Sequence, residues 1–355
     1  MSFTTALFTI LAFRQIDINA LNPCAGCTYL KECILNSTNE TVLVTGGAGF
    51  IGSHLVEALL NQTDKCVVVV DNFLLGDSQN LEQTKGNFDR IDVYRIDASN
   101  FAAMSEIAQN HQIQTIFDLA VVPLPTSLAF PDYTIRTNVE LTTTACELVR
   151  QGYAEKLVHC SSSEVYGTAH FVPMTEDHPL DPLTPYAASK AAGDQIVSSY
   201  VKTFGISAVV VRPFNNYGPR QNTKDYAGLV PTVIQNILRG KPITISGDGS
   251  QTRDYVFVRD TAAALVDIEK NDEFVGEVYN LGTGIETSVN EIVDLISSCM
   301  SSEGQEIQLG NSRAGDVVRH CAGSQKSVQK FGLSLPSISA LQVNETIAWY
   351  AENLE

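Results

Sequence analysis

A tyrosine and a lysine lie four residues apart in the segment PYAASK, at Tyr186 and Lys190. On a helix, residues four apart share one face and lie one turn from each other. A lysine ammonium beside a phenol stabilises the phenolate and lowers the pKa of the tyrosine from about 10 toward neutrality. A tyrosine tuned in this way is a usable general base, whereas the plain alternative is an amphipathic surface pair.

Hydroxyl and carboxyl groups follow a predicted buried strand about twenty residues earlier, in the segment HCSSSEVYG. Ser161, Ser162, Ser163 and Glu164 suit an apolar core poorly, and open α/β sheets bind ligands at the carboxyl ends of their strands. A hydroxyl placed there can share a substrate proton with the tyrosine. The alternative for Glu164 is a strand-end carboxylate that accepts hydrogen bonds from backbone N–H groups.

Three glycines, Gly46, Gly49 and Gly52, recur every three residues between a β-rich run, TVLVTG, and a helical run, SHLVEALLNQ. A backbone without side chains can approach a pyrophosphate closely, and the helix N-terminus supplies free N–H groups. The sequence therefore predicts a dinucleotide phosphate site, at which Phe50 and Ile51 also contact the cofactor.

The next buried run, VVVVD, ends at Asp71, nineteen positions after Gly52. A carboxylate at this position accepts both ribose hydroxyls of the adenosine half and repels a 2′-phosphate, so NAD is the expected cofactor rather than NADP. Asn72 beside it, Asp97 at the end of the third predicted strand and Ala120 after the fourth complete the expected cofactor contacts.

Apolar runs alternate with helical stretches from Glu40 to Phe214. Continuous apolar strands between helices are typical of a parallel sheet that is covered on both faces. Gly- and Pro-rich loops and short helices follow Phe214, which indicates a second, smaller lobe. The expected fold is α/β: a Rossmann-like doubly wound parallel sheet with a smaller C-terminal α/β substrate-binding lobe.

The chain has 355 residues, of which 44% are hydrophobic and 18% charged, and its net charge is −17. An acidic chain repels polyanions, so no nucleic acid is expected as a partner, although a few arginines can still bind a small anion. No apolar run is long enough to predict a membrane span, and the scattered cysteines indicate a reduced, cytoplasmic protein. Cys24, Cys27 and Cys33 lack a fourth ligand nearby, so no metal is predicted.

Together these motifs resemble those of the extended short-chain dehydrogenase/reductase superfamily, in its NAD-dependent NDP-sugar epimerase/dehydratase branch. The matching segments, within about residues 41–350, are TGGAGFIGSHL, DNF, SSSEVYG, PYAASK, RPFNNYGPRQ, GDGSQTRDYVFVRD and RAGD. The resemblance implies that NAD oxidises the C4 carbinol of a nucleotide-bound sugar, that Tyr186 takes the hydroxyl proton and that Lys190 holds the ribose. It also implies Ser162 as the catalytic hydroxyl and a homodimer as the assembly.

The resemblance also implies which residues contact the nucleotide-diphosphate sugar. Asn215 matches an asparagine that contacts the sugar or phosphate, and Arg253, Arg313 and Asp316 match groups that bind the diphosphate and the nucleoside. Arginines suit a diphosphate because their charge is fixed and their donors are forked. Ser127 is expected near the sugar.

Three parts of the chain are distinguished by these patterns. Residues 1–39 are an N-terminal extension of unknown role. Residues 40–213 are the predicted NAD-binding Rossmann domain, with a return segment at about 255–283. Residues 214–254 and 284–355 are the predicted nucleotide-sugar-binding lobe.

The residues next to Ser162 favour one reaction of this branch. Glu164 matches the glutamate with which dehydratases remove the C5 proton, and Ser163 occupies the position of their acid donor. The expected activity is therefore that of an NDP-hexose (aminosugar) 4,6-dehydratase. The alternatives are a 4-epimerase acting on UDP-glucose, UDP-GlcNAc or UDP-glucuronate, then a UDP-glucuronate decarboxylase, and, in a different class, a non-catalytic NAD-binding protein of this fold.

One position departs from the family pattern. The fourth strand usually reads FHLA in this family, whereas this chain reads FDLA, with Asp118 in place of the histidine. The sequence alone offers no physical account of an aspartate beside the cofactor. The prolines Pro123 and Pro125 then stiffen a loop that is expected to border the sugar, so the identity of the substrate stays open.

Overall fold

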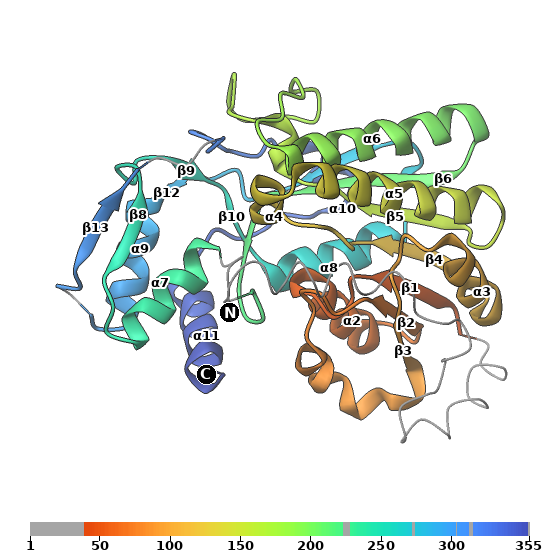
Figure 1. The fold of residues 1–355 in the computed structure, drawn as a ribbon, viewed down its shortest axis with the longest axis horizontal. Helices are drawn as coiled ribbons and strands as arrows, with labels where there is room; N and C mark the ends of the chain where they lie inside the picture. The colour runs from red at the N-terminus through yellow and green to blue at the C-terminus, as the bar shows by residue number, and fades with distance from the viewer. Residues whose placement is uncertain (1–38, 223–227, 272–273, 303, 312–314, 354–355) are drawn as a thin grey trace. The chain divides into compact units, whose positions relative to one another are not determined.

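The computed structural model describes most of the chain from residue 39 onward. Four residues named above lie outside the described residues: the N-terminal cysteines Cys24, Cys27 and Cys33 and the predicted substrate residue Arg313. Figure 1 draws the residues that are not described as a thin grey trace. The described residues are 39–222, 228–271, 274–302, 304–311 and 315–353.

A parallel sheet of seven strands lies between layers of helices (Figure 1). The strands are β1 Thr41–Thr45, β2 Cys66–Asp71, β3 Ile91–Arg95, β4 Ile113–Asp118, β5 Lys156–Cys160, β6 Ser207–Pro213 and β11 Val278–Leu281. Their order is β11-β6-β5-β4-β1-β2-β3, so the chain moves outward from β1 in one direction and from β4 in the other. Open α/β sheets bind ligands at such a change of direction. The expected Rossmann-like fold class is confirmed.

Strands β1 and β2 are largely apolar because both faces of the sheet are covered there. Successive residues of a strand point to opposite faces, and β1 accordingly places Val42 and Val44 in one hydrophobic cluster and Leu43 in another. In β2, Val67 belongs to the first cluster and Val68 to the second. All five side chains are at most 1% exposed, so both faces are buried along these two strands, whereas the edge strand β3 carries polar and exposed residues.

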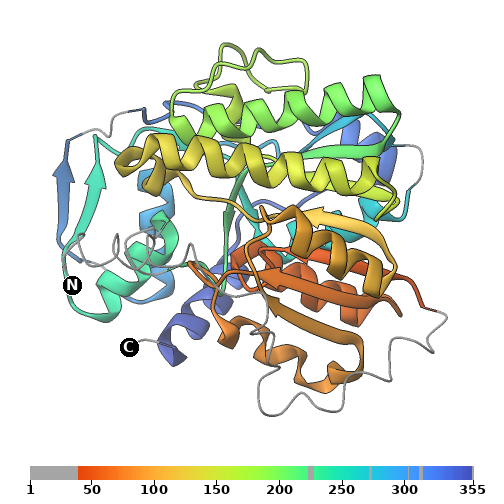
Figure 2. The same ribbon diagram turned by 45° about the vertical axis from the view of Figure 1, so that its right-hand side comes forward.

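Helices cover the two faces of the sheet in two groups (Figures 1 and 2). On one face α2 packs against α8, and on the other α5 lies beside α6 and also contacts α3. Their bounds are α2 Phe50–Gln62, α3 Phe101–His111, α5 Pro131–Arg150, α6 Pro185–Phe204 and α8 Val258–Glu269. Shorter helical segments follow the carboxyl ends of β2, β4 and β5, and these are η3 Ser78–Arg90, α4 Leu124–Ala129 and η4 Ser163–Tyr166.

Short strands and helices form a smaller part of the molecule, drawn toward the blue end of the colour scale in Figure 1. Three two-stranded sheets pair β10 with β7, β12 with β9 and β13 with β8, and α7, α9 and α11 enclose a third hydrophobic cluster. The elements are β7 Asn215–Tyr217, α7 Leu229–Leu238, β8 Ile243–Ser246, β9 Thr252–Arg253, β10 Tyr255–Phe257, β12 Thr287–Ser288, α9 Val289–Cys299, β13 Ile307–Gly310 and α11 Ala340–Glu352. Helix α10, Gln325–Phe331, packs instead against β11 of the large sheet. The chain returns to the large sheet through α8 and β11. The exact domain boundaries stay a prediction.

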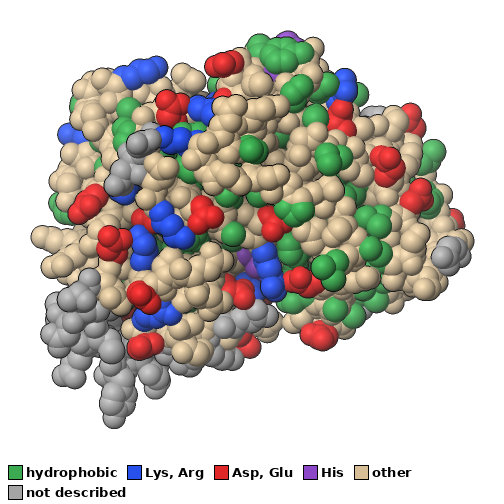
Figure 3. Space-filling view, turned by 180° about the vertical axis from the view of Figure 1, so that it is seen from behind, with side chains coloured by type: hydrophobic (Ala, Val, Ile, Leu, Met, Phe, Trp, Pro, Cys, Tyr) green, Lys and Arg blue, Asp and Glu red, His purple; other side chains and the backbone are tan. Residues whose placement is uncertain are grey.

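The surface of the described residues carries both signs of charge. On the face opposite to that of Figure 1, acidic and basic side chains lie interspersed, without a continuous basic patch (Figure 3). Among the described helices, none has both the length and the apolar composition that a bilayer span requires. The expected absence of a nucleic-acid partner stays a prediction.

Candidate active site

The glycine turn brings the end of β1 and the start of α2 into direct backbone contact. Gly46 has a positive φ of 67°, and its N–H donates to the carbonyl of Val70 at 2.8 Å. A Cβ on Gly52 would lie 2.1 Å from the carbonyl oxygen of Gly46, so no side chain fits there. Helix α2 begins at Phe50 after Gly49, and no side chain of the described residues caps it. Its first N–H groups are therefore available to an anion, which fits the pyrophosphate of a dinucleotide.

Asp71 is tied to this turn by its carboxylate. Its Oδ2 accepts the N–H of Ala48 at 3.0 Å, and its Oδ1 accepts the N–H of Phe73 at 2.8 Å. Burial raises the pKa of this carboxyl group, and the two backbone N–H groups oppose that rise. The structure thus places Asp71 beside the glycine turn, where a ribose hydroxyl would share the carboxylate with the backbone.

The other predicted cofactor residues lie at neighbouring strand ends. Ala120 contacts the turn closely, because a Cβ on Gly46 would lie 3.0 Å from its Cα atom. Asp97 lies two residues beyond β3 and Asn72 one residue beyond β2, and both are exposed. Each side chain caps its own local turn. Asp97 accepts the N–H of Ser99 at 3.0 Å, and Asn72 accepts the N–H of Leu74 at 3.0 Å. Phe50 and Ile51 are the first residues of α2.

The predicted reacting residues meet where α6 begins beside the end of β5. Thr184 caps α6 by accepting the N–H of Ala187 at 3.1 Å, and Tyr186 follows in the first turn. The hydroxyl of Ser162 hydrogen-bonds to the phenol of Tyr186, and Lys190, one turn later on the helix, is buried at 5% exposure. The structure therefore brings Ser162 and Tyr186 together, with Lys190 one turn further along α6, and the catalytic roles of the three residues stay a prediction.

The pKa of Tyr186 differs from the expectation. Burial raises it above its ordinary value of about 10, and the hydrogen bond from Ser162 lowers it by less. The predicted lowering by Lys190 is not found in the structure, because the phenolate loses hydration on burial and the charges of Cys160 and Glu164 raise the pKa further.

Ser163 and Glu164 lie in the short segment η4, directly after Ser162. The Oγ atom of Ser162 accepts the N–H of Glu164 at 3.2 Å, whereas Ser163 is only 2% exposed. Burial raises the pKa of the Glu164 carboxyl group, the charge of Arg253 lowers it and that of Asp316 raises it further. Glu164 thus faces the predicted nucleotide-binding residues as well as the phenol.

Arg253 and Asp316, which come from separate motifs, form an ion pair. The guanidinium of Arg253, on β9, donates to Asp316 Oδ1 at 2.7 Å and to the carbonyl of Thr252 at 2.9 Å. An arginine has five N–H donors, so this pairing leaves others for a diphosphate. The sequence predicted both residues for the nucleotide but not the contact between them.

The two remaining predicted substrate residues differ in their surroundings. Ser127, on α4, is fully buried, and its hydroxyl donates to the carbonyl of Leu124 at 2.7 Å, so its one O–H donor is used within its own helix. Asn215, on β7, has a buried Oδ1 atom without a hydrogen-bond partner among the described residues. Buried polar atoms are usually satisfied, so this acceptor fits a residue that awaits a donor from a ligand.

Two polar residues near the site were not found from the sequence. The hydroxyl of Thr45, at the end of β1, accepts the N–H groups of Leu119 and Ala120, both at 3.0 Å, and so fixes the chain where it leaves β4. His159, at the end of β5, hydrogen-bonds through Nδ1 to Asp118 Oδ2 at 2.8 Å. The signal for both was a polar residue inside an otherwise apolar strand.

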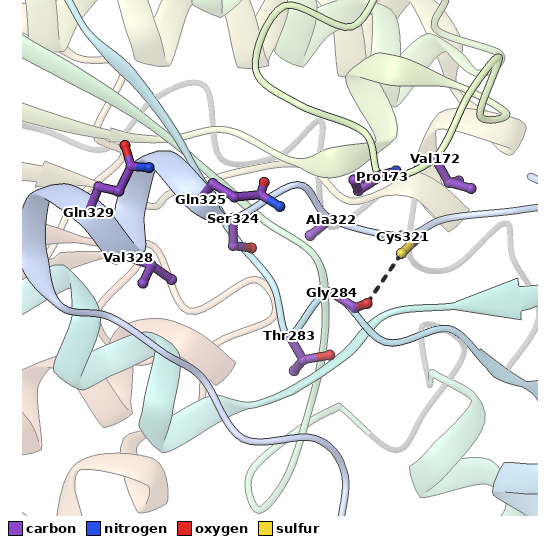
Figure 4. A pocket seen from close by; sticks show the side chains of 10 residues that line it. All are labelled: Val172, Pro173, Thr283, Gly284, Cys321, Ala322, Ser324, Gln325, Val328 and Gln329. Atoms are coloured by element: carbon purple, nitrogen blue, oxygen red, sulfur yellow. Dashed lines mark hydrogen bonds between the residues drawn. The ribbon is translucent and has the colours of Figure 1, made fainter.

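A surface hollow lies between the segment that carries Pro173 and the start of α10 (Figure 4). Its lining includes Cys321, whose thiol donates to the carbonyl of Gly284 at 3.5 Å, and it contains none of the predicted site residues. Within the described residues, the hollow holds no pair of acid and base groups, so it offers no site for the predicted reaction.

The glycine turn suits a dinucleotide, and Ser162, Tyr186 and Lys190 lie near the end of β5. Together these features are typical of an NAD-dependent enzyme, and the motifs around them are typical of one that acts on a nucleotide sugar. The family model described as NAD dependent epimerase/dehydratase family matches residues 42–282. The chain belongs to this family, and its cofactor is NAD.

Relatives with different activities resemble the chain at similar levels. The UDP-glucose 4-epimerase of Mycolicibacterium smegmatis is 33% identical over 310 residues, which cover 87% of this chain and 97% of that protein. The dTDP-glucose 4,6-dehydratase of Neisseria gonorrhoeae is 30% identical over 339 residues, with coverages of 88% and 96%. The chain is therefore an NDP-sugar epimerase or dehydratase.

A solved structure supports the same assignment. The UDP-glucuronic acid 4-epimerase of Bacillus cereus, in complex with UDP-glucuronic acid and NAD, superimposes with a TM-score of 0.81 at 29% identity. The superposition covers 88% of this chain and 99% of that chain. The relatives divide between the two reactions and favour the epimerase over the dehydratase that the sequence motifs suggested.

Proposed function

We propose that the chain is a UDP-sugar 4-epimerase. The single observation that carries this proposal is the burial of Ser163, which leaves the position of the dehydratase acid donor with a hydroxyl that is 2% exposed. Dehydration requires a base for the C5 proton and an acid for the departing C6 hydroxyl, and serine is too weak an acid for the second role. Epimerisation requires one acid–base group at C4 only, and the similarity to UDP-glucose 4-epimerases points the same way.

The proposed reaction begins and ends at the phenol of Tyr186. When bound, NAD would supply the acceptor and then the donor of the C4 hydride, and the ketosugar would present its opposite face in between. Tyr186 takes the proton of the C4 hydroxyl and later gives it back, Ser162 orients that hydroxyl through its hydrogen bond to the phenol, and Lys190 binds the ribose. Because burial raises the pKa of Tyr186, the proposal predicts a rate that rises with pH as the phenolate forms.

The substrate would lie between these residues and the smaller part of the molecule. Arg253 and Asp316 are proposed to bind the diphosphate and the nucleoside, and Asn215 is proposed to donate to or accept from the sugar or phosphate. The ion pair at 2.7 Å fixes the guanidinium before the substrate arrives, which reduces the side-chain entropy lost on binding.

A 4,6-dehydratase is the second candidate, and Glu164 is the observation that favours it. Burial raises the pKa of its carboxyl group, as suits a base that works near neutral pH, and its charge also acts on the phenol of Tyr186. In a dehydratase, Glu164→Gln would abolish the exchange of the C5 hydrogen for solvent deuterium while NAD binding persists.

Mass spectrometry of products separates these reactions. Purified protein is incubated with UDP-glucose, UDP-GlcNAc and UDP-glucuronate, and with the GDP and dTDP counterparts. An isobaric product with a new C4 configuration is the expected result. A product lighter by one water would contradict the epimerase and establish the dehydratase, whereas loss of carbon dioxide would indicate the decarboxylase. Tyr186→Phe is the control, because it should form product at least about 10²-fold more slowly with every substrate.

Two further features remain proposals. A homodimer is expected from the family resemblance, and sedimentation at several protein concentrations tests it. A cytoplasmic location is expected from the scattered cysteines, and fractionation of cells that express the full chain tests that expectation.

A further inference from the structure

Asp254 is a buried residue that directly follows Arg253 in the chain. It lies between β9 and β10 and is 0% exposed. A carboxylate without water is costly unless hydrogen-bond donors replace the lost hydration. The donors around Asp254 come from two segments that are distant from it in sequence, and they indicate what the residue does.

Each carboxylate oxygen of Asp254 accepts two hydrogen bonds. Oδ1 accepts the N–H of Thr283 at 2.8 Å and the hydroxyl of the same residue at 2.7 Å. Oδ2 accepts the N–H of Gly284 at 2.8 Å and that of Ala322 at 3.0 Å. Burial raises the pKa of this carboxyl group, and the hydrogen bonds oppose that rise. Because backbone N–H groups can only donate, the carboxylate fixes the backbone of both segments.

Gly282 lets these two segments approach the carboxylate closely. A Cβ there would lie 2.2 Å from the Cβ of Ala322 and 3.0 Å from Asp254 Oδ2. Figure 4 shows Thr283, Gly284 and Ala322 near one another on one border of the hollow described above. The carboxylate thus joins the loop that follows β11 to the segment that precedes α10.

The backbone of Asp254 fixes a third segment. Its carbonyl accepts the N–H of Asn215 at 3.0 Å, where β7 begins beside β10. Asn215 carries the buried Oδ1 atom that has no hydrogen-bond partner among the described residues. Asp254 therefore holds the backbone of a residue whose side chain is proposed to meet the sugar or phosphate.

The loop that carries Asp316 is hydrogen-bonded to the chain on both sides of Arg253. Before the arginine, the N–H of Thr252 donates to the carbonyl of Val318 at 3.1 Å. After the arginine, the carboxylate of Asp254 accepts an N–H from the same loop further on. The guanidinium of Arg253 and Asp316 Oδ1, which lie 2.7 Å apart, are thus held by these bonds as well as by their own contact.

We propose that Asp254 is a positioning residue for the nucleotide-sugar site. Its carboxylate and its carbonyl hold Asn215, Arg253 and Asp316 in the arrangement that binds the diphosphate and the nucleoside. Asp254 acts through these neighbours, because donors of the chain already occupy both of its carboxylate oxygens. The inference rests on the proposed substrate roles of Arg253 and Asn215, but not on whether epimerisation or dehydration follows.

Binding of nucleoside diphosphates to the NAD-loaded full chain tests the proposal. Calorimetric titration with UDP and with dTDP gives the dissociation constant for the ligand that binds more tightly. Asp254→Asn replaces one acceptor oxygen by an NH2 group that faces N–H or O–H donors, so hydrogen bonds at that oxygen are lost. We expect the dissociation constant and KM for the nucleotide sugar to rise roughly 10-fold or more, while kcat and the amount of bound NAD stay nearly unchanged.

A milder variant tests the proposal even if Asp254→Asn does not fold. Thr283→Val removes only the hydroxyl that donates to Asp254 at 2.7 Å and keeps the shape of the side chain. It should raise the dissociation constant roughly 3-fold, because one hydrogen bond to a charged group is lost. Thr283→Ser retains the hydroxyl and should restore the affinity of the wild type.

Glu269 and Thr115 provide the matched control. Glu269, at the end of α8, is a buried carboxylate that accepts the hydroxyl of Thr115 at 2.9 Å, and neither residue belongs to the proposed site. Glu269→Gln and Thr115→Val should lower the free energy of unfolding without changing the affinity for the nucleoside diphosphate. A comparable loss of affinity in these controls would overturn a specific role of Asp254.

Arg253→Gln separates a failure of this inference from a failure of the proposed function. If neither UDP nor dTDP binds the wild type, or if Arg253→Gln leaves the affinity unchanged, the proposed substrate site is wrong. If Arg253→Gln weakens binding but folded Asp254→Asn and Thr283→Val bind like the wild type, only the inference about Asp254 is overturned. Lower stability at unchanged affinity would then assign Asp254 to the fold alone.

Discussion

The dinucleotide side of the site is formed mainly by backbone atoms, whereas the proposed substrate side is formed mainly by side chains. On the dinucleotide side, close backbone contacts shape the turn: Gly52 lies against Gly46, and α2 starts without a side-chain cap. On the proposed substrate side, long side chains are expected to provide the shape, above all Arg253 and Asp316, which form an ion pair. A backbone site is specified within one short segment, whereas a side-chain site is assembled from segments far apart in sequence. The glycine turn should therefore tolerate no added atom, whereas substitution of Arg253 or Asp316 should weaken substrate binding by degrees.

The largest effect should come from adding one methyl group to the glycine turn. In Gly52→Ala the new Cβ would lie 2.1 Å from the carbonyl oxygen of Gly46, so the start of α2 must shift. We expect loss of NADH binding and a decrease of about 2–4 kcal/mol in the free energy of unfolding, measured by denaturant titration. Gly86→Ala is the control, since a Cβ there meets no atom within 4 Å, and it should leave both quantities nearly unchanged.

Removal of the phenolic hydroxyl is the next largest change. Tyr186→Phe should lower kcat by about 10²-fold or more, because the C4 proton loses its acceptor, while NADH affinity stays close to that of the wild type. In the wild type, the raised pKa of Tyr186 predicts that kcat/KM increases with pH on the acid side of its optimum. A pH-independent kcat/KM through the neutral and alkaline range would contradict the assignment of this phenol as the base.

A substitution on the substrate side should act mainly on KM. Arg253→Gln keeps a polar side chain but removes the charge that pairs with Asp316, and we expect KM for the nucleotide sugar to rise roughly 10-fold or more. NADH affinity should not change, because the turn is built independently of this pair. The control is Arg319→Gln, which removes a 2.7 Å ion pair with Glu286 at a 52% exposed arginine side chain. Removing that exposed pair should leave stability nearly unchanged and should not affect KM.

The smallest expected effect concerns stability as a function of pH. The pKa of Glu164 is raised by burial, so its contribution to stability is fully present below the pKa of the unfolded chain and is lost as pH rises through the folded pKa. Glu164→Gln should therefore be slightly more stable than the wild type at pH 8, by roughly 0.5 kcal/mol, with the difference disappearing at low pH.

Glu291 provides the opposite sign as a control. Hydrogen bonds from Ser288 at the start of α9 lower the pKa of this exposed carboxyl group. Glu291→Gln should be less stable than the wild type at neutral pH, and the difference should fade as pH falls through the lowered pKa. Equal pH profiles for the two variants would mean that burial does not determine the behaviour of Glu164.

The backbone half of the site could be predicted from the sequence because its determinants are local. Gly46, Gly49 and Gly52 report directly on where side chains do not fit, and Asp71 follows at the end of the next strand. The alternation of apolar strands and helices likewise predicted the sheet, because burial on both faces makes its central strands largely apolar. The spacing of the glycines and the apolar composition of each strand can both be recognised within one short segment of the sequence.

For the proposed substrate side, the sequence predicted which residues belong to the site but not how they contact one another. Arg253 and Asp316 were assigned to the nucleotide, but their mutual contact depends on how β9 approaches a loop 63 residues later. Ser127 was expected at the sugar, yet its hydroxyl is used inside α4, an arrangement that depends on local helix geometry. Asp118 was unexplained because its partner His159 is adjacent only in the register of two strands. The raised pKa of Tyr186 was missed since the spacing of residues says nothing about hydration.

The uncapped start of α2 has a consequence for the life of the protein in the cell. A helix whose first donors await an anion is completed by its cofactor, so loading with dinucleotide should stabilise the whole fold, by about 4 kcal/mol when the free dinucleotide exceeds its dissociation constant 1,000-fold. Chains that have lost their dinucleotide should then be the first to be degraded by proteases. The abundance of the enzyme would follow the supply of dinucleotide as well as its own synthesis.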